Sequence, residues 1–176
     1  MEINPGDNWK AIIGLVREIR RCEECGVTTA AVAMAFICID TLASLGRPEN
    51  KDRVTRSDFK EWINAHLKGH PDQPYQYRGK DVYAARCAFL HTYGSAAELH
   101  QEDPDTIKFM YHNGGKHAYD PNTKPNIAII GTKSFINDVV HAVESFLKEC
   151  ENDSSLRNRV EKRLPSVLQK MPFPSK

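Results

Sequence analysis

The chain has little of what marks an exported, membrane-bound or strongly charged protein. Its formal net charge is only +1 over 176 residues, so no strong overall field draws it toward nucleic acid or a membrane surface. No apolar run approaches the roughly 20 residues that span a bilayer. The N-terminus also lacks the basic and then apolar segment of an export signal. We therefore expect a cytoplasmic protein with no membrane partner.

Cysteine is sparse, and its pattern does not indicate disulfides or a metal site. The five cysteines are an odd number, and without an export signal they are typical of reduced thiols in the cytosol. Cys22 and Cys25 form a Cys-x2-Cys pair, but no second pair completes the four ligands of a structural zinc. We expect plain thiols here, and no bound metal.

Several common enzyme motifs are missing as well. The sequence contains no Gly-x4-Gly-Lys-Ser/Thr loop, no Gly-x-Ser-x-Gly elbow, no His-Glu-x2-His helix and no Gly-x-Gly-x2-Gly turn. An ATPase, a serine hydrolase, a zinc protease and a dinucleotide enzyme are therefore unsupported. No cofactor is predicted.

What the sequence does contain is a succession of helical patterns within the length of one domain. Apolar residues recur at spacings of three and four, which predicts helices over 9–26, 28–45, 58–67, 81–92 and 134–153, and a shorter polar one over 156–164. Asp7 or Asn8 is expected to cap the first of them, and Ser57 the third. We expect a single domain over residues 1–164 and a flexible tail over 165–176.

The helical spacing of apolar residues ends at Pro104, and the residues that follow have the pattern of β-strands. Residues 106–112 are predicted to form a strand that turns at Asn113-Gly-Gly115 and pairs with residues 116–119 as a hairpin. Residues 126–131 are predicted to form a third short strand. The fold class is therefore mainly α: a helical bundle of about five helices with a small β-hairpin or three-stranded insertion before the last long helix.

Two helices carry the polar residues that point to a site. Residues 30–42 are apolar on almost every side, as in a central helix, yet they include Asp40, a carboxylate that is costly to bury unless it is paired. The helix over 81–92 carries Arg86 and His91. An arginine beside a buried face needs an anionic or carbonyl partner because it does not lose its proton, whereas a histidine exchanges a proton near neutral pH.

The spacing of Arg86 and His91 limits how they can act together. Five residues at about 100° each set the two side chains about 140° apart around a straight helix. Either His91 lies where the helix is ending, or a second copy of the helix completes the site.

Arg86-Cys-Ala-Phe-Leu-His91 resembles the Arg-x4-6-His signature of the HEPN superfamily of small helical domains, many of them ribonucleases. The order of elements is similar: two long helices before the motif helix, a short β insertion and one closing helix. The resemblance implies a homodimer in which two motifs face one cleft and cleave RNA without a metal. Arg86 would hold the phosphate and His91 would transfer a proton. It also implies a role in toxin–antitoxin or defence systems.

Other interpretations stay open. In the nuclease members the residue after the arginine is usually Asn, Asp or His, and here it is Cys87. Together with the weak net charge, Cys87 favours a catalytically silent module that binds a nucleotide or a partner protein. A structural dimer without a ligand is a third interpretation. Asp40 either supports the site by orienting Arg86 or His91, or simply neutralises Arg86.

Four further residues are candidates for binding. Histidine and tyrosine near a cleft can stack on a base or contact a phosphate. The alternative is a solvated hairpin edge. The candidates are Tyr83 on the motif helix and Tyr111, His112 and His117 on the predicted hairpin.

Overall fold

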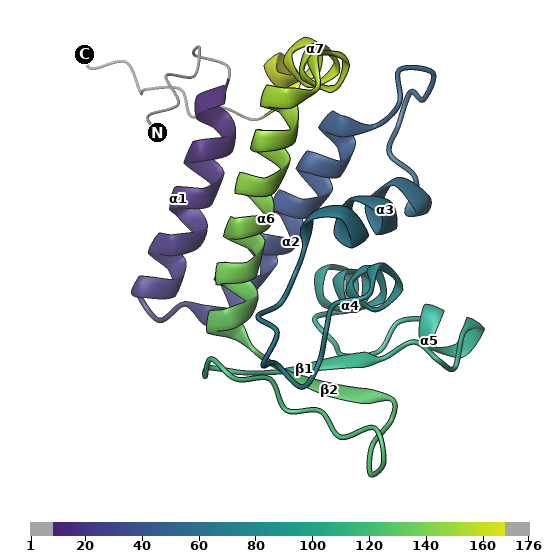
Figure 1. The fold of residues 1–176 in the computed structure, drawn as a ribbon. Helices are drawn as coiled ribbons and strands as arrows, with labels where there is room; N and C mark the ends of the chain where they lie inside the picture. Colours follow the sequence, from purple (N-terminus) through teal and green to yellow (C-terminus); the bar gives the residue numbers. More distant parts are fainter. Residues whose placement is uncertain (1–8, 168–176) are drawn as a thin grey trace.

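Long helices form the body of the molecule, and a small sheet covers its lower end (Figure 1). The structure, a computed structural model, describes residues 9–167. Within that range the helices are α1 (Lys10–Glu24), α2 (Thr28–Gly46), α3 (Arg56–His66), α4 (Gly79–Thr92), the single turn α5 (Leu99–Glu102), α6 (Thr132–Asn152) and α7 (Ser154–Arg163), followed by a 3-10 turn over Leu164–Ser166. The strands are β1 (Lys108–His112) and β2 (Ile127–Gly131).

The mainly helical fold class is confirmed, although the part of the chain that the structure describes holds seven helices where about five were expected. The count of five left out the shorter polar helix, which was predicted over 156–164 and is α7, and the one-turn α5. Leu164, the last residue of the predicted domain, is buried, and residues 164–166 form the 3-10 turn. Residues 168–176 of the predicted tail lie outside the described residues.

Helix α2 lies at the centre of the bundle. It packs against α1, α3, α4, α6 and α7, and it buries the large side chains of Phe36, Ile39 and Leu42 completely. Its 19 residues are long and apolar enough to cross a membrane by length and composition alone. The prediction that no apolar run approaches the length of a membrane span is therefore wrong. Much of this apolar surface lies in the core that α2 shares with its neighbours.

The cap of helix α3 is Thr55, two residues before the predicted cap. The Thr55 side chain accepts from the Asp58 amide, and the Asp58 carboxylate accepts from the Thr55 amide, which makes a capping box. Ser57 therefore lies inside the first turn, where its hydroxyl donates to Glu61. The prediction of Ser57 as the cap is wrong because Thr55 satisfies the free amide first. The proposed cap of the first helix, at residues 7–8, lies outside the described residues.

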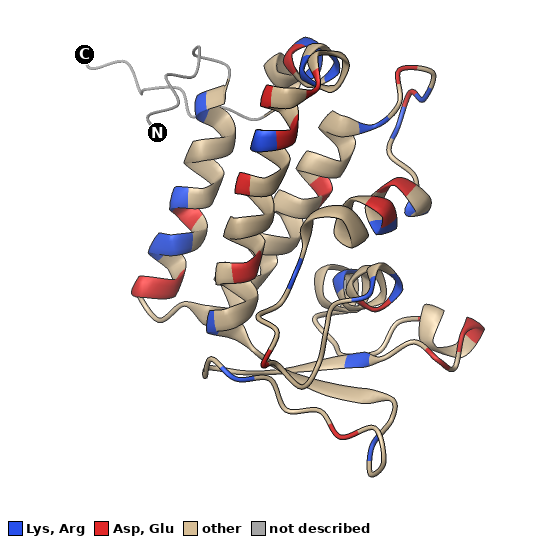
Figure 2. Ribbon diagram, viewed as in Figure 1, with Lys and Arg blue, Asp and Glu red and all other residues tan. Residues whose placement is uncertain are grey.

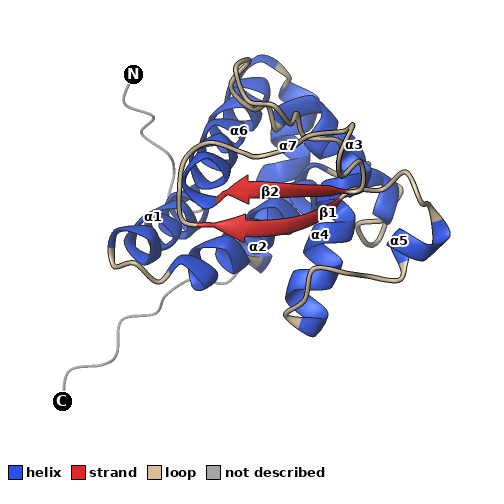
Figure 3. Cartoon of the chain, turned by 90° about the horizontal axis from the view of Figure 1, so that it is seen from below, coloured by secondary structure: helices blue, strands red, loops and turns tan. Residues whose placement is uncertain are grey.

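The predicted β-hairpin is also wrong. Strand β1 pairs in parallel with β2, with Lys108 opposite Ile127 and His112 opposite Gly131. The 116–119 segment makes only one isolated antiparallel bridge, from Ala118 to Ile129 of β2. The sheet lies across the lower ends of the helices, and its strands contact α4 and α6 (Figure 3).

The reason is that the loop after β1 is fixed by a side chain and by close backbone contact. The His112 ring donates from Nε2 to the Lys116 carbonyl, and its Nδ1 accepts from the Gly114 amide. The loop then passes so close to the start of α6 that a Cβ at Gly131 would lie 2.7 Å from the Gly115 oxygen. A side chain at this crossing would meet the Gly115 backbone, and β1 pairs with β2 and not with the segment that follows the loop.

Candidate functional site

Arg86 of α4 reaches Asp40 of α2 at the surface where these two helices pack. Its Nε donates to Asp40 Oδ2 over 2.8 Å, and its Nη2 lies 2.6 Å from the same oxygen. The side chains are 22% and 28% exposed, respectively. The pair is therefore half-buried and stays open to solvent on one side.

His91 completes a line of three groups. Arg86 Nη1 lies 3.1 Å from His91 Nε2, and since a guanidinium can only donate, Nε2 must be the acceptor. This contact requires the neutral ring with its proton on Nδ1. His91 is exposed in the last turn of α4, which ends at Tyr93 with a left-handed φ of 52°. The long arginine side chain spans the angle between the two positions, so they meet within one chain.

The local pKa shifts show how the pair is held together. Burial raises the pKa of Asp40, and the hydrogen bond and charge of Arg86 oppose that rise. Burial alone would lower the pKa of Arg86, but the hydrogen bond and charge of Asp40 outweigh it, so the pKa of Arg86 rises. Asp40 thus holds one edge of the guanidinium as a fixed cation, which leaves Nη1 directed at His91.

The outer face of α4 continues the site one turn toward the start of the helix, at Tyr83. The Arg56 guanidinium of α3 lies 5.6 Å from the centre of the Tyr83 ring, and the Lys60 ammonium 5.9 Å from it. Burial and the neighbouring Cys87 raise the pKa of Tyr83, and Arg56 opposes this shift. Tyr83 is therefore an aromatic surface with two cations on it. Sequence patterns did not single out Arg56 and Lys60, because only the packing of α3 on α4 brings them to the tyrosine.

Exposed apolar side chains lie beside these polar groups. Ile37 lies one helical turn before Asp40 and Thr41 on α2 and is 41% exposed. Tyr93 at the end of α4 is 74% exposed, and its hydroxyl donates to Thr29 at the start of α2. Ile37 and Tyr93 are thus exposed apolar side chains on the two helices that carry the charged pair.

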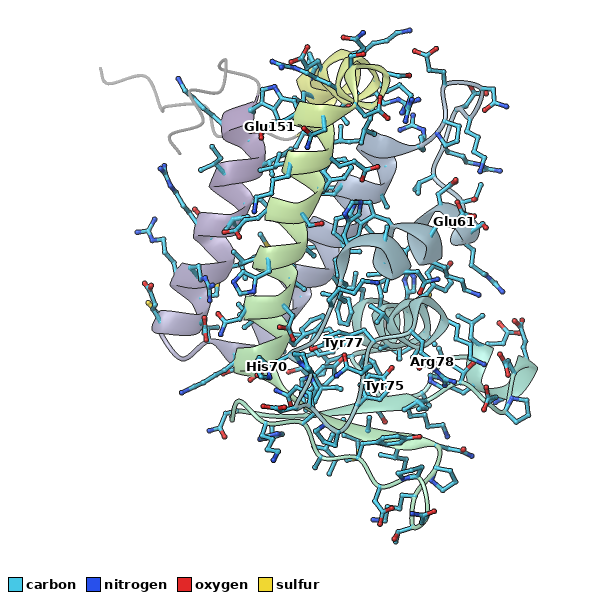
Figure 4. The ribbon with its side chains drawn as sticks, viewed as in Figure 1. Glu61, His70, Tyr75, Tyr77, Arg78 and Glu151 are labelled. Atoms are coloured by element: carbon cyan, nitrogen blue, oxygen red, sulfur yellow. The ribbon has the colours of Figure 1, made fainter. Side chains whose placement is uncertain are left out.

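His117 is not at the surface, which overturns its assignment as a binding residue. It is 2% exposed. Its Nε2 donates to the Tyr77 hydroxyl over 2.8 Å, Tyr77 donates to Asp138 Oδ2 over 2.9 Å, and the Gly131 amide donates to His117 Nδ1. Burial lowers the pKa of His117 to about 4. Figure 4 shows Tyr77 between the lower end of α6 and the sheet. The ring is a neutral structural link, and for His117 the alternative of a solvated position fails for the same reason.

His112 and Tyr111 are also used by the fold. Both nitrogens of His112 bond to the loop that follows β1. The Tyr111 ring packs edge-on against Phe89 at 5.4 Å, and its hydroxyl is buried without a hydrogen-bond partner among the residues described. Burial raises the pKa of Tyr111. Of the predicted site residues, the structure thus groups Arg86, His91, Asp40 and Tyr83, and places the other three in the sheet region.

Over residues 9–167, no group of three or more His, Cys, Asp or Glu side chains is arranged to hold a metal ion. No protein-family model, curated protein or solved structure matches this chain. Any functional conclusion therefore rests on the site itself.

Proposed function

We propose that the protein is a HEPN-like, metal-independent endoribonuclease that acts as a homodimer. The observation that supports this proposal is the line Asp40–Arg86–His91, with Arg86 Nη1 3.1 Å from His91 Nε2 at a solvent-facing position. The cleavage of RNA through its own 2′-hydroxyl needs a cation on the phosphate and a group that moves protons, and no metal. An arginine and a histidine in contact supply both.

Each residue has a definite role in this scheme. A phosphate that enters between the two side chains accepts from Arg86 Nη1, which releases His91 Nε2 to take a proton. Asp40 keeps the other edge of the guanidinium in place. The 2′-oxygen then bonds to phosphorus as the bond from phosphorus to the 5′-oxygen breaks. One histidine removes the proton of the 2′-hydroxyl, and a protonated histidine gives one to the leaving 5′-oxygen. The products carry 2′,3′-cyclic phosphate and 5′-hydroxyl ends.

The need for both a base and an acid supports a dimer. One chain offers a single histidine at this site, so a second copy would supply the other. The exposed Ile37 and Tyr93 beside the site give the apolar surface that such an interface needs.

Charges of both signs are mixed over the surface, so an RNA would bind at one small site and not along an extended basic face. Lysines and arginines lie among acidic residues on α1, α3, α4, α6 and α7 (Figure 2), in line with the net charge of +1. Arg56 and Lys60 beside Tyr83 give one place where a base could stack on an aromatic ring with cations close to its phosphates.

A second candidate function is a catalytically silent module that binds a nucleotide or a partner protein. The observation that favours it is that Asp40 engages two of the three guanidinium nitrogens, at 2.8 and 2.6 Å. A cation so fully paired has less charge to offer a transition state. Cys87, the uncommon neighbour of Arg86, points the same way.

The deciding experiment is cleavage of mixed RNA by the purified protein in excess chelator. We expect cleavage by the wild type with 2′,3′-cyclic ends, and rates lower by about 10²–10⁴-fold for Arg86→Ala and His91→Ala. His70→Ala is the matched control, because His70 is an exposed histidine that contacts a carboxylate, Asp72, elsewhere on the surface. Activity that survives in His91→Ala would exclude the proposed chemistry.

The dimer is tested separately by sedimentation. Ile37→Glu places a charge at the exposed Ile37 and should convert a dimeric wild type to monomer, whereas Glu24→Gln, at the exposed end of α1, should not. A folded, dimeric wild type that cleaves no RNA would move the assignment to the silent module.

A further inference from the structure

Two cations of α3 converge on one tyrosine of α4. The Arg56 guanidinium lies 5.6 Å from the centre of the Tyr83 ring, and the Lys60 ammonium lies 5.9 Å from it. Arg56 and Lys60 are four residues apart, so they lie on the same face of α3, where like charges repel. The contact with the ring offsets part of this repulsion, but it leaves both positive charges in place.

Little negative charge balances the two cations. Arg56 lies 3.3 Å from the Glu102 carboxylate, but both side chains are 52% exposed, and an ion pair so open to water contributes little. Lys60 has no carboxylate within 4.0 Å over residues 9–167. The surface beside Tyr83 therefore carries more positive than negative charge.

The acidic residues of α3 itself have other partners. The buried Asp58 lies 2.6 Å from the Lys51 ammonium. The exposed Glu61 accepts from the Ser57 hydroxyl. A positive surface on a chain whose net charge is only +1 is thus a local feature, and it lies where α3 packs on the helix of Arg86.

The tyrosine joins these cations to the candidate nuclease site. Tyr83 precedes Arg86 by three residues on α4, so the two side chains lie on one face of the helix, about 5–6 Å apart at Cβ. Both are partly exposed. A strand of a nucleic-acid duplex advances about 3.4 Å per nucleotide. A strand held at Arg86 therefore brings another of its phosphates within reach of Arg56 and Lys60.

We propose that Arg56 and Lys60 form a second phosphate subsite, which binds single-stranded RNA beside the phosphate held by Arg86. Both cations donate to the oxygens of this second phosphate, and Arg56 gives up its exposed contact with Glu102. Tyr83 is a positioning residue, because its ring holds the two cations together. This inference rests on the proposed function, since it takes the substrate at Arg86 to be RNA. It adds that the substrate is a strand of several nucleotides and not a single nucleotide.

The test measures binding to an RNA that cannot be cleaved. A fluorescein-labelled oligouridylate with 2′-O-methyl groups lacks the attacking hydroxyl, so fluorescence anisotropy reports its binding whether or not the protein is a nuclease. Lys60→Gln should weaken binding about 10-fold at low salt. It should also reduce the slope of log K against log salt concentration by about 0.7, the value for one phosphate contact on a single strand.

The matched control is Lys68→Gln, which should leave both the affinity and the salt slope unchanged. Lys68 is an exposed lysine beyond the end of α3, and its ammonium donates to the Asn64 carbonyl. Its substitution changes the net charge by the same amount as Lys60→Gln. A difference between the two variants therefore reports the place of the charge and not its amount.

Two variants test the tyrosine. Tyr83→Phe keeps the ring and should retain most of the binding, whereas Tyr83→Leu removes the ring and should weaken binding. Tyr83→Leu should also reduce the salt slope, which a loss of stability alone does not change. Equal salt slopes for Tyr83→Leu and Tyr83→Phe would overturn the positioning role.

The outcomes separate this inference from the nuclease proposal. Weaker binding and a lower salt slope in Lys60→Gln, beside an unchanged Lys68→Gln, support the subsite whether or not RNA is cleaved. Equal binding by Lys60→Gln, Arg56→Gln and the wild type overturns the subsite, and the cleavage assay then decides the nuclease proposal by itself. The subsite is also overturned if the wild type does not bind the oligonucleotide, or binds uridine monophosphate as tightly.

Discussion

Helix α4 takes part in two arginine–aspartate pairs that lie in opposite settings, one at its start and one that joins its middle to α2. At the start, Asp81 is completely buried and accepts from Arg78 Nε and Nη2, the Tyr75 hydroxyl and the Ile107 amide. In the second pair, Asp40 of α2 is half-buried, and Arg86 in the middle of α4 is its hydrogen-bond donor within the described range. Figure 4 shows Arg78 and Tyr75 on the sheet side of the bundle.

The two pairs differ in how many of their hydrogen-bonding groups remain available to a ligand. A carboxylate that already accepts four hydrogen bonds has no room for a ligand, and its role is to fix the backbone around it. The Asp40 pair keeps an accessible Arg86 Nη1 whose partner is a titratable ring. Identical residue types thus give a structural link where burial closes the network and a candidate site where solvent keeps it open.

The strongest test of this comparison is to neutralise each aspartate in turn. Asp81→Asn should lower the free energy of unfolding by about 3 kcal/mol, because it leaves Arg78 and the other donors facing an amide in a buried position. Asp40→Asn should cost less than about 1 kcal/mol, since its pair is partly exposed. Urea unfolding followed by far-UV circular dichroism measures both. Equal losses of unfolding free energy would mean that both pairs stabilise the fold to the same extent, which contradicts the comparison.

The buried His117 and the exposed His91 differ in the same way as the two aspartates. The burial of His117 can be tested by changing the pH. In the folded protein the pKa of His117 is about 4, below its usual 6.5. Between these values the unfolded chain binds a proton that the folded chain does not, so the free energy of unfolding falls as pH drops from 6.5 to 4. The loss from this group is about 3 kcal/mol. It is measured as the difference between urea unfolding at the two pH values.

A variant measures how much His117 contributes to the pH dependence of the free energy of unfolding. His117→Gln should reduce this pH dependence, whereas His91→Gln leaves the buried His117 ring in place. The buried His66 contributes in the same direction and is present in both variants. If the two variants retain the same pH dependence, the His117 ring is not held neutral by burial.

The smallest expected effect concerns single hydroxyl groups. Tyr75→Phe removes one of four donors to Asp81 and should cost about 1 kcal/mol. Tyr93→Phe removes a bond to Thr29 at the surface, where water replaces it, and should leave the free energy of unfolding unchanged. Thermal unfolding of the two variants side by side measures the contrast. A larger loss from Tyr93→Phe would place that hydroxyl in the structural network.

Much of the helical framework follows from local patterns. The apolar run around Phe36 and Ile39 predicted the central helix, and the spacing of Phe135, Val139 and Phe146 predicted α6. The strand pairing could not be predicted in the same way. A Gly-Gly turn after β1 suits a hairpin locally, but the His112 ring and the crossing at Gly131 lead the chain elsewhere.

The site was predictable only in part. The Arg-x4-His spacing selected Arg86 and His91, and the isolated charge of Asp40 in an apolar helix marked it as a residue in need of a partner. His117 failed as a candidate because no sequence pattern shows that its ring turns inward to Tyr77 and Asp138, which are distant in the chain.

The sequence by itself determined where most helices lie and which of their faces are apolar, because helix periodicity is a property of neighbours along the chain. It also supplied the arginine and histidine of the candidate site. Only the tertiary structure decided which polar groups are closed off and which stay open. That choice depends on desolvation and on partners such as Tyr75 for Asp81 or Asp40 for Arg86, and packing alone sets these.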